Sequence, residues 1–128
     1  MIHKLEHVGI MVKDMDASIR FYTEILNLEL VGREKLDNGV ELSFLSYPDT
    51  DHIQVELVGR GSDDIPAAGK VDHLAFTVSN IEAEVERLRG LGVKLIDEKP
   101  KTILGGVQIA FFYGPDGERL EFFQPKQA

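Results

Sequence analysis

The sequence predicts an α+β fold in which two βαβββ modules form a curved eight-stranded mixed sheet with the helices on its outer face. Three observations predict it: a motif that occurs twice, the same order of strand and helix patterns after each copy, and a run of turn-forming residues between the copies. We expect a single domain over 1–128, with module one at about 1–60, a connection at about 61–70 and module two at about 71–125.

The first module begins with alternating side chains over residues 2–12, as expected of a strand. Apolar residues then recur at helical spacing over 15–28, and Asp14 is placed to cap that helix. Three strands follow, at about 29–35, 40–47 and 52–59. The breaks between them are turn formers, Asp37-Asn38-Gly39 and Pro48-Asp49-Thr50-Asp51.

The second module repeats this order. A strand over 71–78 leads to Ser79 or Asn80 as a helix cap, and the helix runs to about Leu91 before Gly92. Strands are predicted near 93–98, 107–113 and 119–124, with a tight turn at Pro115-Asp116-Gly117 between the last two.

The repeated motif places one histidine and one glutamate in each module. His7-x4-Val12-x-Asp14 recurs as His73-x4-Val78-x-Asn80, and each module closes on a carboxylate, Glu56 or Glu121. Glu56 lies 49 residues after His7, and Glu121 lies 48 after His73. Two imidazoles and two carboxylates suit a divalent metal such as Zn, Ni, Co or Mn. We therefore expect these four residues to be metal ligands.

The composition excludes some kinds of metal ligand and argues against some classes of binding partner. The 128 residues include no cysteine, which excludes disulfides and thiolate ligands. With 14 Lys and Arg against 22 Asp and Glu, the net charge of −8 argues against nucleic acid and anionic membranes as partners. The charged, alternating start of the chain differs from a secretory signal, so we expect a cytoplasmic protein.

Nearly the whole chain resembles the vicinal oxygen chelate superfamily, which includes glyoxalase I and is built from paired βαβββ modules. The segments that carry the resemblance are His7 to Asp14 with Phe21-Tyr22, Val55-Glu56-Leu57, Val71 to Ala75, and Gly114 to Glu121. It implies that His7, Glu56, His73 and Glu121 bind one divalent metal ion, Ni, Co, Zn or Mn. The His, Glu, His, Glu order is that of glyoxalase I.

A glyoxalase I-like member would be a lyase that acts on the hemithioacetal of a 2-oxoaldehyde, such as methylglyoxal, and a small thiol. The resemblance implies that Glu121 removes a proton from the thiol-bearing carbon, and that the proton returns to the neighbouring carbon to give a 2-hydroxyacyl thioester. Glu56 would be a ligand or assist reprotonation. The metal would take up the developing oxyanion charge.

Two further positions concern the substrate and the assembly. Glutathione-using relatives commonly have an arginine four residues after the first histidine, where this chain has Met11, so bacillithiol or another small thiol is an alternative to glutathione. Arg60 is a candidate contact for an anionic substrate group. The resemblance also implies a homodimer, in which His7 and Glu56 of one chain face His73 and Glu121 of the other.

Two alternatives remain open at the level of sequence. A methylmalonyl-CoA epimerase-like enzyme would use the same proton abstraction and usually has a glutamine as its second ligand, a role that Gln54 would take if the alignment slipped by two residues. A drug-binding protein of the bleomycin-resistance kind would bind a small molecule without catalysis, although such relatives generally lack the complete ligand set.

Overall fold

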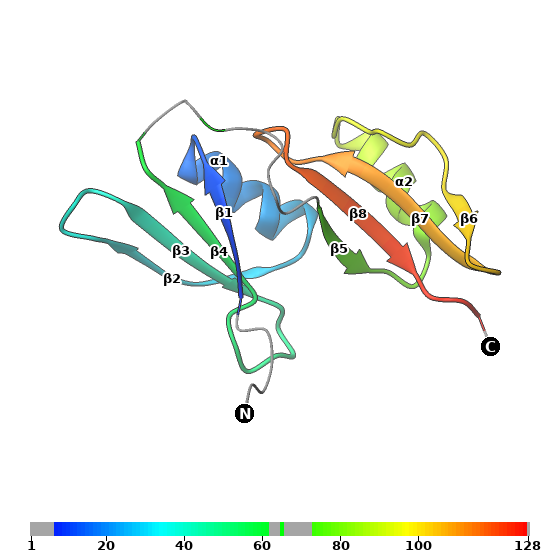
Figure 1. The fold of residues 1–128 in the computed structure, drawn as a ribbon, viewed down its shortest axis with the longest axis horizontal. Coiled ribbons are helices and arrows are strands. Elements are labelled where there is room, and N and C mark those ends of the chain that lie inside the picture. The colour runs from blue at the N-terminus through cyan, green and yellow to red at the C-terminus, as the bar shows by residue number, and fades with distance from the viewer. Residues whose placement is uncertain (1–6, 62–64, 66–72, 128) are drawn as a thin grey trace. The chain divides into compact units, whose positions relative to one another are not determined.

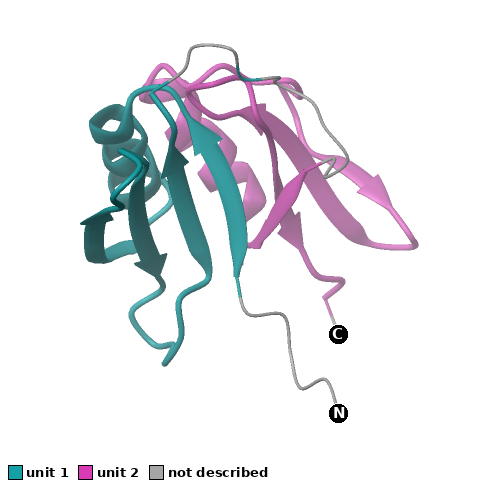
Figure 2. Cartoon of the chain, turned by 60° about the vertical axis from the view of Figure 1, so that its left-hand side comes forward, with its two compact units in different colours: residues 1–65 teal, residues 66–128 magenta. Residues whose placement is uncertain are grey.

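The structure is a computed structural model that describes residues 7–61, 65 and 73–127. The chain divides into two compact units, residues 1–65 (unit 1) and 66–128 (unit 2), coloured separately in Figure 2. Some predicted segments lie outside the described residues. They are the first residues of the strands predicted at 2–12 and 71–78, and most of the connection predicted at 61–70.

Unit 1 contains a helical segment and a four-stranded mixed sheet (Figure 1). Its strands lie in the order β1-β4-β3-β2, with β1 parallel to β4 and the other neighbours antiparallel. The elements are β1 (Val8–Val12), α1 (Met15–Arg20), η1 (Phe21–Ile25), β2 (Glu29–Lys35), β3 (Glu41–Ser46) and β4 (Val55–Gly59).

Unit 2 has the same topology, with strand order β5-β8-β7-β6 and β5 parallel to β8. Its elements are β5 (Leu74–Thr77), α2 (Ile81–Gly90), β6 (Lys101–Ile103), β7 (Val107–Tyr113) and β8 (Arg119–Gln124). The predicted α+β fold of two βαβββ modules is confirmed. Within the described residues its eight strands form two hydrogen-bonded sheets of four.

Both helices begin at the predicted caps. The Asp14 carboxylate accepts a hydrogen bond from the Ala17 N–H, and the Asn80 side chain accepts one from the Ala83 N–H. These bonds satisfy amides that the first turn of a helix leaves without a partner. Asn80, and not Ser79, is therefore the cap of α2.

The first helical segment ends earlier than predicted. α1 passes into the π-helical turn η1, where the Leu26 N–H donates to the Phe21 carbonyl, and the segment stops at Ile25 instead of residue 28. Asn27 has a φ of 65°, a left-handed conformation that asparagine tolerates better than most residues. This residue turns the chain into β2.

Each sheet has one face covered by its own helix and one open face. In unit 1, α1 contacts β3 and β4, and the covered face contributes Val12, Leu45, Val55 and Leu57 to a buried core. In unit 2, α2 contacts β7 and β8. Its buried core includes Val85, Leu88, Phe112, Leu120 and Phe122. The side chains of the opposite face do not enter these cores.

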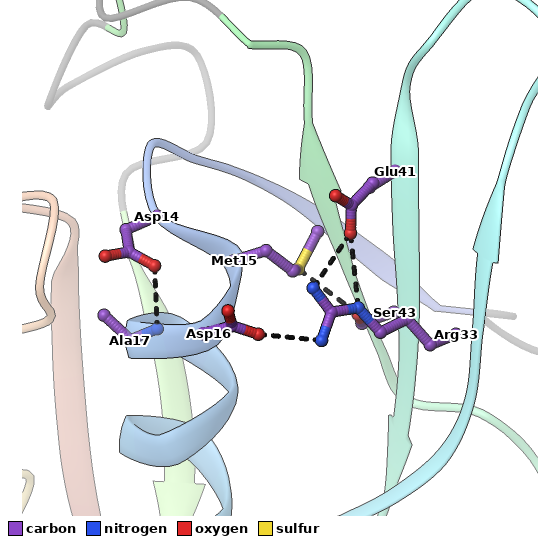
Figure 3. A network of polar contacts seen from close by, with 7 residues as sticks. All are labelled: Asp14, Met15, Asp16, Ala17, Arg33, Glu41 and Ser43. Atoms are coloured by element: carbon purple, nitrogen blue, oxygen red, sulfur yellow. Dashed lines mark hydrogen bonds and ion pairs between the residues drawn. The ribbon is translucent and has the colours of Figure 1, made fainter.

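Arg33 joins the start of α1 to the sheet of unit 1 (Figure 3). Its Nη1 donates to Asp16 at 2.8 Å, while Nε and Nη2 donate to Glu41 Oε2 at 3.2 and 3.0 Å. The hydrogen bonds to Asp16 and Glu41 raise the pKa of Arg33. Because Arg33 faces Ser43 in the β2–β3 ladder, on the helix-covered side, we assign this arginine to the fold and not to a site.

The strand predicted near 93–98 was wrong: the fourth strand of unit 2 is β6, which begins after Pro100. Residues 93–98 contact β7 through one isolated bridge, Leu95 to Phe112. The Ile96 and Asp97 N–H groups both donate to the Phe111 carbonyl, so an extra residue interrupts the ladder there.

The predicted turns occur where expected. Gly39, with a φ of 89°, closes the hairpin between β2 and β3, and Gly117, with a φ of 78°, closes the one between β7 and β8. The end of the Glu118 side chain lies over Gly114, where a Cβ would come within 2.3 Å of the Glu118 carboxyl carbon. No helix in the described part of the chain has the length and apolar character needed to cross a membrane.

Candidate functional site

In unit 1 the structure brings His7 and Glu56 together on the open face. His7 directly precedes β1, and Glu56 is the register partner of Gly9 in the parallel β1–β4 pair. The His7 Nε2 atom lies 3.3 Å from Glu56 Oε2, with the two side chains 38% and 20% exposed. Both side chains are thus partly accessible to a ligand.

Unit 2 repeats this arrangement with His73 and Glu121. Glu121 is the register partner of Ala75 in the parallel β5–β8 pair, and His73 lies two residues before Ala75. The His73 Nε2 atom is 3.5 Å from Glu121 Oε1. The Glu121 side chain is 9% exposed, so this carboxylate is the more buried of the two.

The two pairs are equivalent in register as well as in sequence. In each unit, the glutamate faces a small residue two positions after the histidine, Gly9 in unit 1 and Ala75 in unit 2. A Cβ built on Gly9 would meet no atom within 4 Å. Small residues at these positions leave space beside each pair, as the sequence indicated.

The donor set fits a divalent transition metal. Imidazole nitrogen and carboxylate oxygen bind such ions at about 2.0–2.2 Å, so two ligands of one ion lie roughly 3 to 3.5 Å apart. The His7–Glu56 and His73–Glu121 contacts fall in this range. Each unit supplies two donors, and the described residues contain no cluster of three or more His, Asp or Glu side chains.

Gln54 is engaged elsewhere. It precedes β4, and its side-chain oxygen accepts hydrogen bonds from the Tyr47 N–H at 2.8 Å and from the Thr50 hydroxyl at 3.2 Å. These bonds hold the turn between β3 and β4. The side chain that contacts His7 is that of Glu56.

Met11 and Arg60 lie further along the same two strands. Met11 is 42% exposed and is the register partner of Val58, two residues beyond Glu56. Arg60 follows the last residue of β4 and is exposed. Met11 therefore presents an apolar surface on the open face of unit 1, whereas Arg60 is a cation just beyond the strand.

Sequence reasoning missed the aromatic neighbours of the two glutamates. Phe44 in β3 faces Glu56, and Phe111 in β7 faces Glu121. The Phe111 ring lies 5.2 Å from the His73 ring, edge to face at 88°, and the Arg119 guanidinium lies 5.8 Å from the centre of the same phenyl ring. The available signal was the β7–β8 hairpin, whose turn fixes which residue faces Glu121.

Comparison with known proteins identifies relatives over most of the chain. The Glyoxalase/Bleomycin resistance protein/Dioxygenase superfamily matches residues 4–122. Uncharacterized protein YwbC of Bacillus subtilis is 42% identical over 125 residues, covering 97% of this chain and 99% of the relative. Lactoylglutathione lyase of Salmonella typhimurium is 30% identical over 128 residues, covering 98% and 95%.

A solved structure of a glyoxalase I has the same fold as this chain. The trypanothione-dependent glyoxalase I of Leishmania major superposes with a TM-score of 0.80 at 25% sequence identity, covering 96% of this chain and 87% of that chain. The likeness to this enzyme extends over both βαβββ modules.

Proposed function

This chain belongs to the Glyoxalase/Bleomycin resistance protein/Dioxygenase superfamily, and from that premise we propose that it is a metal-dependent lyase of the glyoxalase I type. Its substrate would be the hemithioacetal of a 2-oxoaldehyde, such as methylglyoxal, and a small thiol, and its product a 2-hydroxyacyl thioester. The observation that carries the proposal is the equivalent register of two His–Glu pairs on two open sheet faces.

In this proposal His7, Glu56, His73 and Glu121 hold one divalent ion, Ni, Co, Zn or Mn. The ion, when bound, withdraws electron density from the substrate oxygens and so acidifies the adjacent carbon. Because each unit contributes two donors, a complete site needs both kinds of module. We propose a homodimer in which His7 and Glu56 of one subunit face the partner's His73 and Glu121.

Glu121 is proposed as the catalytic base. It takes the proton from the thiol-bearing carbon and returns it to the neighbouring carbon, while the hydroxyl proton of the first carbon passes to the oxygen on the second, so no atom is gained or lost overall. Its side chain is 9% exposed, against 20% for Glu56. Lower exposure to water favours the return of the same proton and supports this division of roles. Glu56 remains a ligand or assists reprotonation.

Substrate contacts are proposed at Met11 and Arg60. Met11 stands where glutathione-using relatives commonly have an arginine, so bacillithiol or another small thiol is an alternative to glutathione. Arg60, exposed after β4, would meet an anionic group of the substrate. The role in the cell would be the detoxification of methylglyoxal in the cytoplasm.

The epimerase alternative is less well supported. It would place a glutamine at the second ligand position, but the Gln54 side chain already accepts bonds from Tyr47 and Thr50. Activity with an acyl-CoA in place of methylglyoxal and thiol would favour it. Binding of a drug by a protein that holds no metal would favour the bleomycin-resistance type.

The test begins with metal analysis of the purified protein. Methylglyoxal turnover is then measured with glutathione and with bacillithiol after reconstitution with Ni, Co, Mn or Zn separately. Glu121→Gln keeps the size of the side chain but removes the base, and we expect turnover to fall by at least about 100-fold. Glu29→Gln, an exposed change on β2, is the matched control and should leave turnover unchanged.

Two results would contradict the proposal. One is a protein that binds none of these metals when all four ligands are intact. The other is turnover by Glu121→Gln at the rate of the unmodified chain.

A further inference from the structure

Asp97 is a buried carboxylate that the proposed reaction does not use. Its side chain is 6% exposed and lies in the segment between α2 and β6. Burying a charged carboxylate is unfavourable unless it is paired and hydrogen-bonded, so its partners indicate what it does. Those partners are the Lys101 ammonium group and the main chain of Phe111.

The Asp97 segment holds both main-chain polar groups of Phe111. Asp97 Oδ2 accepts a hydrogen bond from the Phe111 N–H at 2.8 Å. In return, the Phe111 carbonyl accepts bonds from the Ile96 and Asp97 N–H groups, each at 3.0 Å. Asp97 Oδ1 lies 3.0 Å from Lys101 Nζ, on the exposed side. Phe111 is therefore fixed in place by this bulge.

Phe111 in turn contacts the His73–Glu121 pair. Its ring packs against the His73 imidazole, and Phe111 faces Glu121 across the β7–β8 ladder. An edge-to-face contact limits the rotamers that an imidazole side chain can adopt. Phe111 is therefore one of the residues that can restrict the orientation of the His73 ring beside Glu121.

In the described part of unit 1, no buried carboxylate lies beside the equivalent phenylalanine. Phe44 occupies the position of Phe111, facing Glu56, but its neighbour on the other side is Gly32 in the β2–β3 ladder. The ladder is irregular beside both phenylalanines, since the β2–β3 register shifts between Leu30 and Gly32 next to Phe44; the difference in unit 2 is that the Asp97 carboxylate accepts the Phe111 N–H. Among the described residues, a buried acid bonded to this phenylalanine is found in unit 2 alone.

We propose that Asp97 is a positioning residue for the metal-binding pair His73 and Glu121, acting through Phe111. The inference rests on the proposed function, because it concerns the metal that these two residues would hold. Outer residues that orient metal ligands contribute substantially to affinity, and their loss typically weakens binding by 10- to 100-fold. Asp97 and Phe111 would have this effect without touching the ion.

The experiment measures the dissociation constant for Ni(II), by competition with a chromophoric chelator, and the visible spectrum of the Co(II)-loaded full-length protein. Phe111→Leu removes the contact with His73 and leaves the main-chain bond to Asp97. Asp97→Ala removes that bond. We expect each change to weaken Ni(II) binding by about 10-fold or more and to alter the Co(II) bands.

Two variants serve as controls. Asp97→Asn retains an oxygen that can accept the Phe111 N–H bond, so we expect Ni(II) affinity within about 3-fold of the unmodified chain. Lys101→Gln removes the other partner of Asp97. The Lys101 side chain is 64% exposed, so this change should leave the Ni(II) affinity and the Co(II) spectrum unchanged. Urea unfolding of every variant separates loss of metal affinity from loss of stability.

The inference is overturned if Phe111→Leu and Asp97→Ala lower stability but bind Ni(II) as the unmodified protein does. It is also overturned if Asp97→Asn behaves like Asp97→Ala. Should Asp97→Ala fail to fold, Phe111→Leu decides alone. If the unmodified protein binds no metal, the proposed function fails as well. If the unmodified protein binds Ni(II) and neither substitution changes its affinity, only the inference about Asp97 fails.

Discussion

Gly9 and Ala75 show how one small side chain determines what a neighbouring glutamate can do. Each lies directly across the ladder from a proposed ligand, Glu56 or Glu121. At this position a large side chain would occupy the space into which the carboxylate and imidazole point. Unit 2 already has a Cβ at the equivalent position, so unit 1 should accept one too.

Substitution of Gly9 tests this view of the space beside the first pair. Gly9→Ala should raise the free energy of unfolding by about 0.5–1 kcal/mol, because alanine restricts the unfolded chain and its Cβ meets no atom within 4 Å. Gly9→Leu should fold but lose metal affinity by about 10-fold, since it crowds His7 and Glu56. Urea unfolding and metal titration measure the two effects. A Gly9→Leu protein that binds metal normally would show that the ion lies elsewhere.

The candidate ligands could be predicted from the sequence because they repeat. His7, Glu56, His73 and Glu121 stand at nearly equal spacing in two copies, and that repetition needs no knowledge of the fold. Among their supporting residues the phenylalanines repeat, as Phe44 and Phe111, but the buried acid Asp97 does not. Asp97 acts on Phe111 through a bulge in unit 2, and the choice of Phe111 as neighbour depends on the β7–β8 register. The contact of Asp97 with Phe111 is a tertiary fact that no local pattern contains, whereas the pairing of Phe111 with Glu121 follows from the hairpin turn.

At the scale of the element, helix starts were predictable and strand limits were less so. Asp14 and Asn80 cap helices through bonds to residues three positions later, which is a local property of the sequence. The edge strand of unit 2 depends instead on which β7 groups are available for pairing. Residues 93–98 contain the bulge at Ile96 and Asp97, and the edge strand is β6, which begins after Pro100.

The loop between β3 and β4 is tied to the end of the first helical segment by Tyr47. Its hydroxyl donates to the Leu26 carbonyl at 2.9 Å, just after η1. Burial raises the pKa of Tyr47 from 10.0 to about 12, because the phenolate would lose hydration. The same burial that makes this bond useful thus makes the loop sensitive to alkali.

This raised pKa predicts a pH dependence of stability with a definite sign. The unfolded chain ionises Tyr47 near pH 10 and the folded chain near pH 12, so the stabilisation is complete below pH 10 and is lost as the pH rises towards 12. Tyr47→Phe should cost about 1 kcal/mol at neutral pH through the lost hydrogen bond, and it should flatten this alkaline decline. The free energy of unfolding of both proteins, measured at pH 8, 10 and 11, gives the cost of the lost hydrogen bond and the slope of the alkaline decline. Equal alkaline declines in the two proteins would assign the effect to another group.

At the scale of the whole molecule, the two units carry half of the proposed ligand set each. Each unit has its own core, helix and sheet, so each can hold its His–Glu pair in place independently. The proposed four-ligand site would combine a first module with a second module, from one chain or from two. The two arrangements predict different activities for dimers assembled from two different variants.

Mixing variants distinguishes these arrangements. In a homodimer with sites shared between subunits, His7→Ala and His73→Ala are each inactive, but a mixed dimer has one site that receives no substitution. Unfolding an equal mixture and refolding it together should restore about a quarter of the unmodified activity, since half of the dimers are mixed and each has one intact site of two. The control pair, His7→Ala with Glu56→Ala, damages the first module in both chains and should restore none. If the first mixture also stays inactive although mixed dimers form, each site is built within a single chain, and the proposed exchange of half-sites between subunits is wrong.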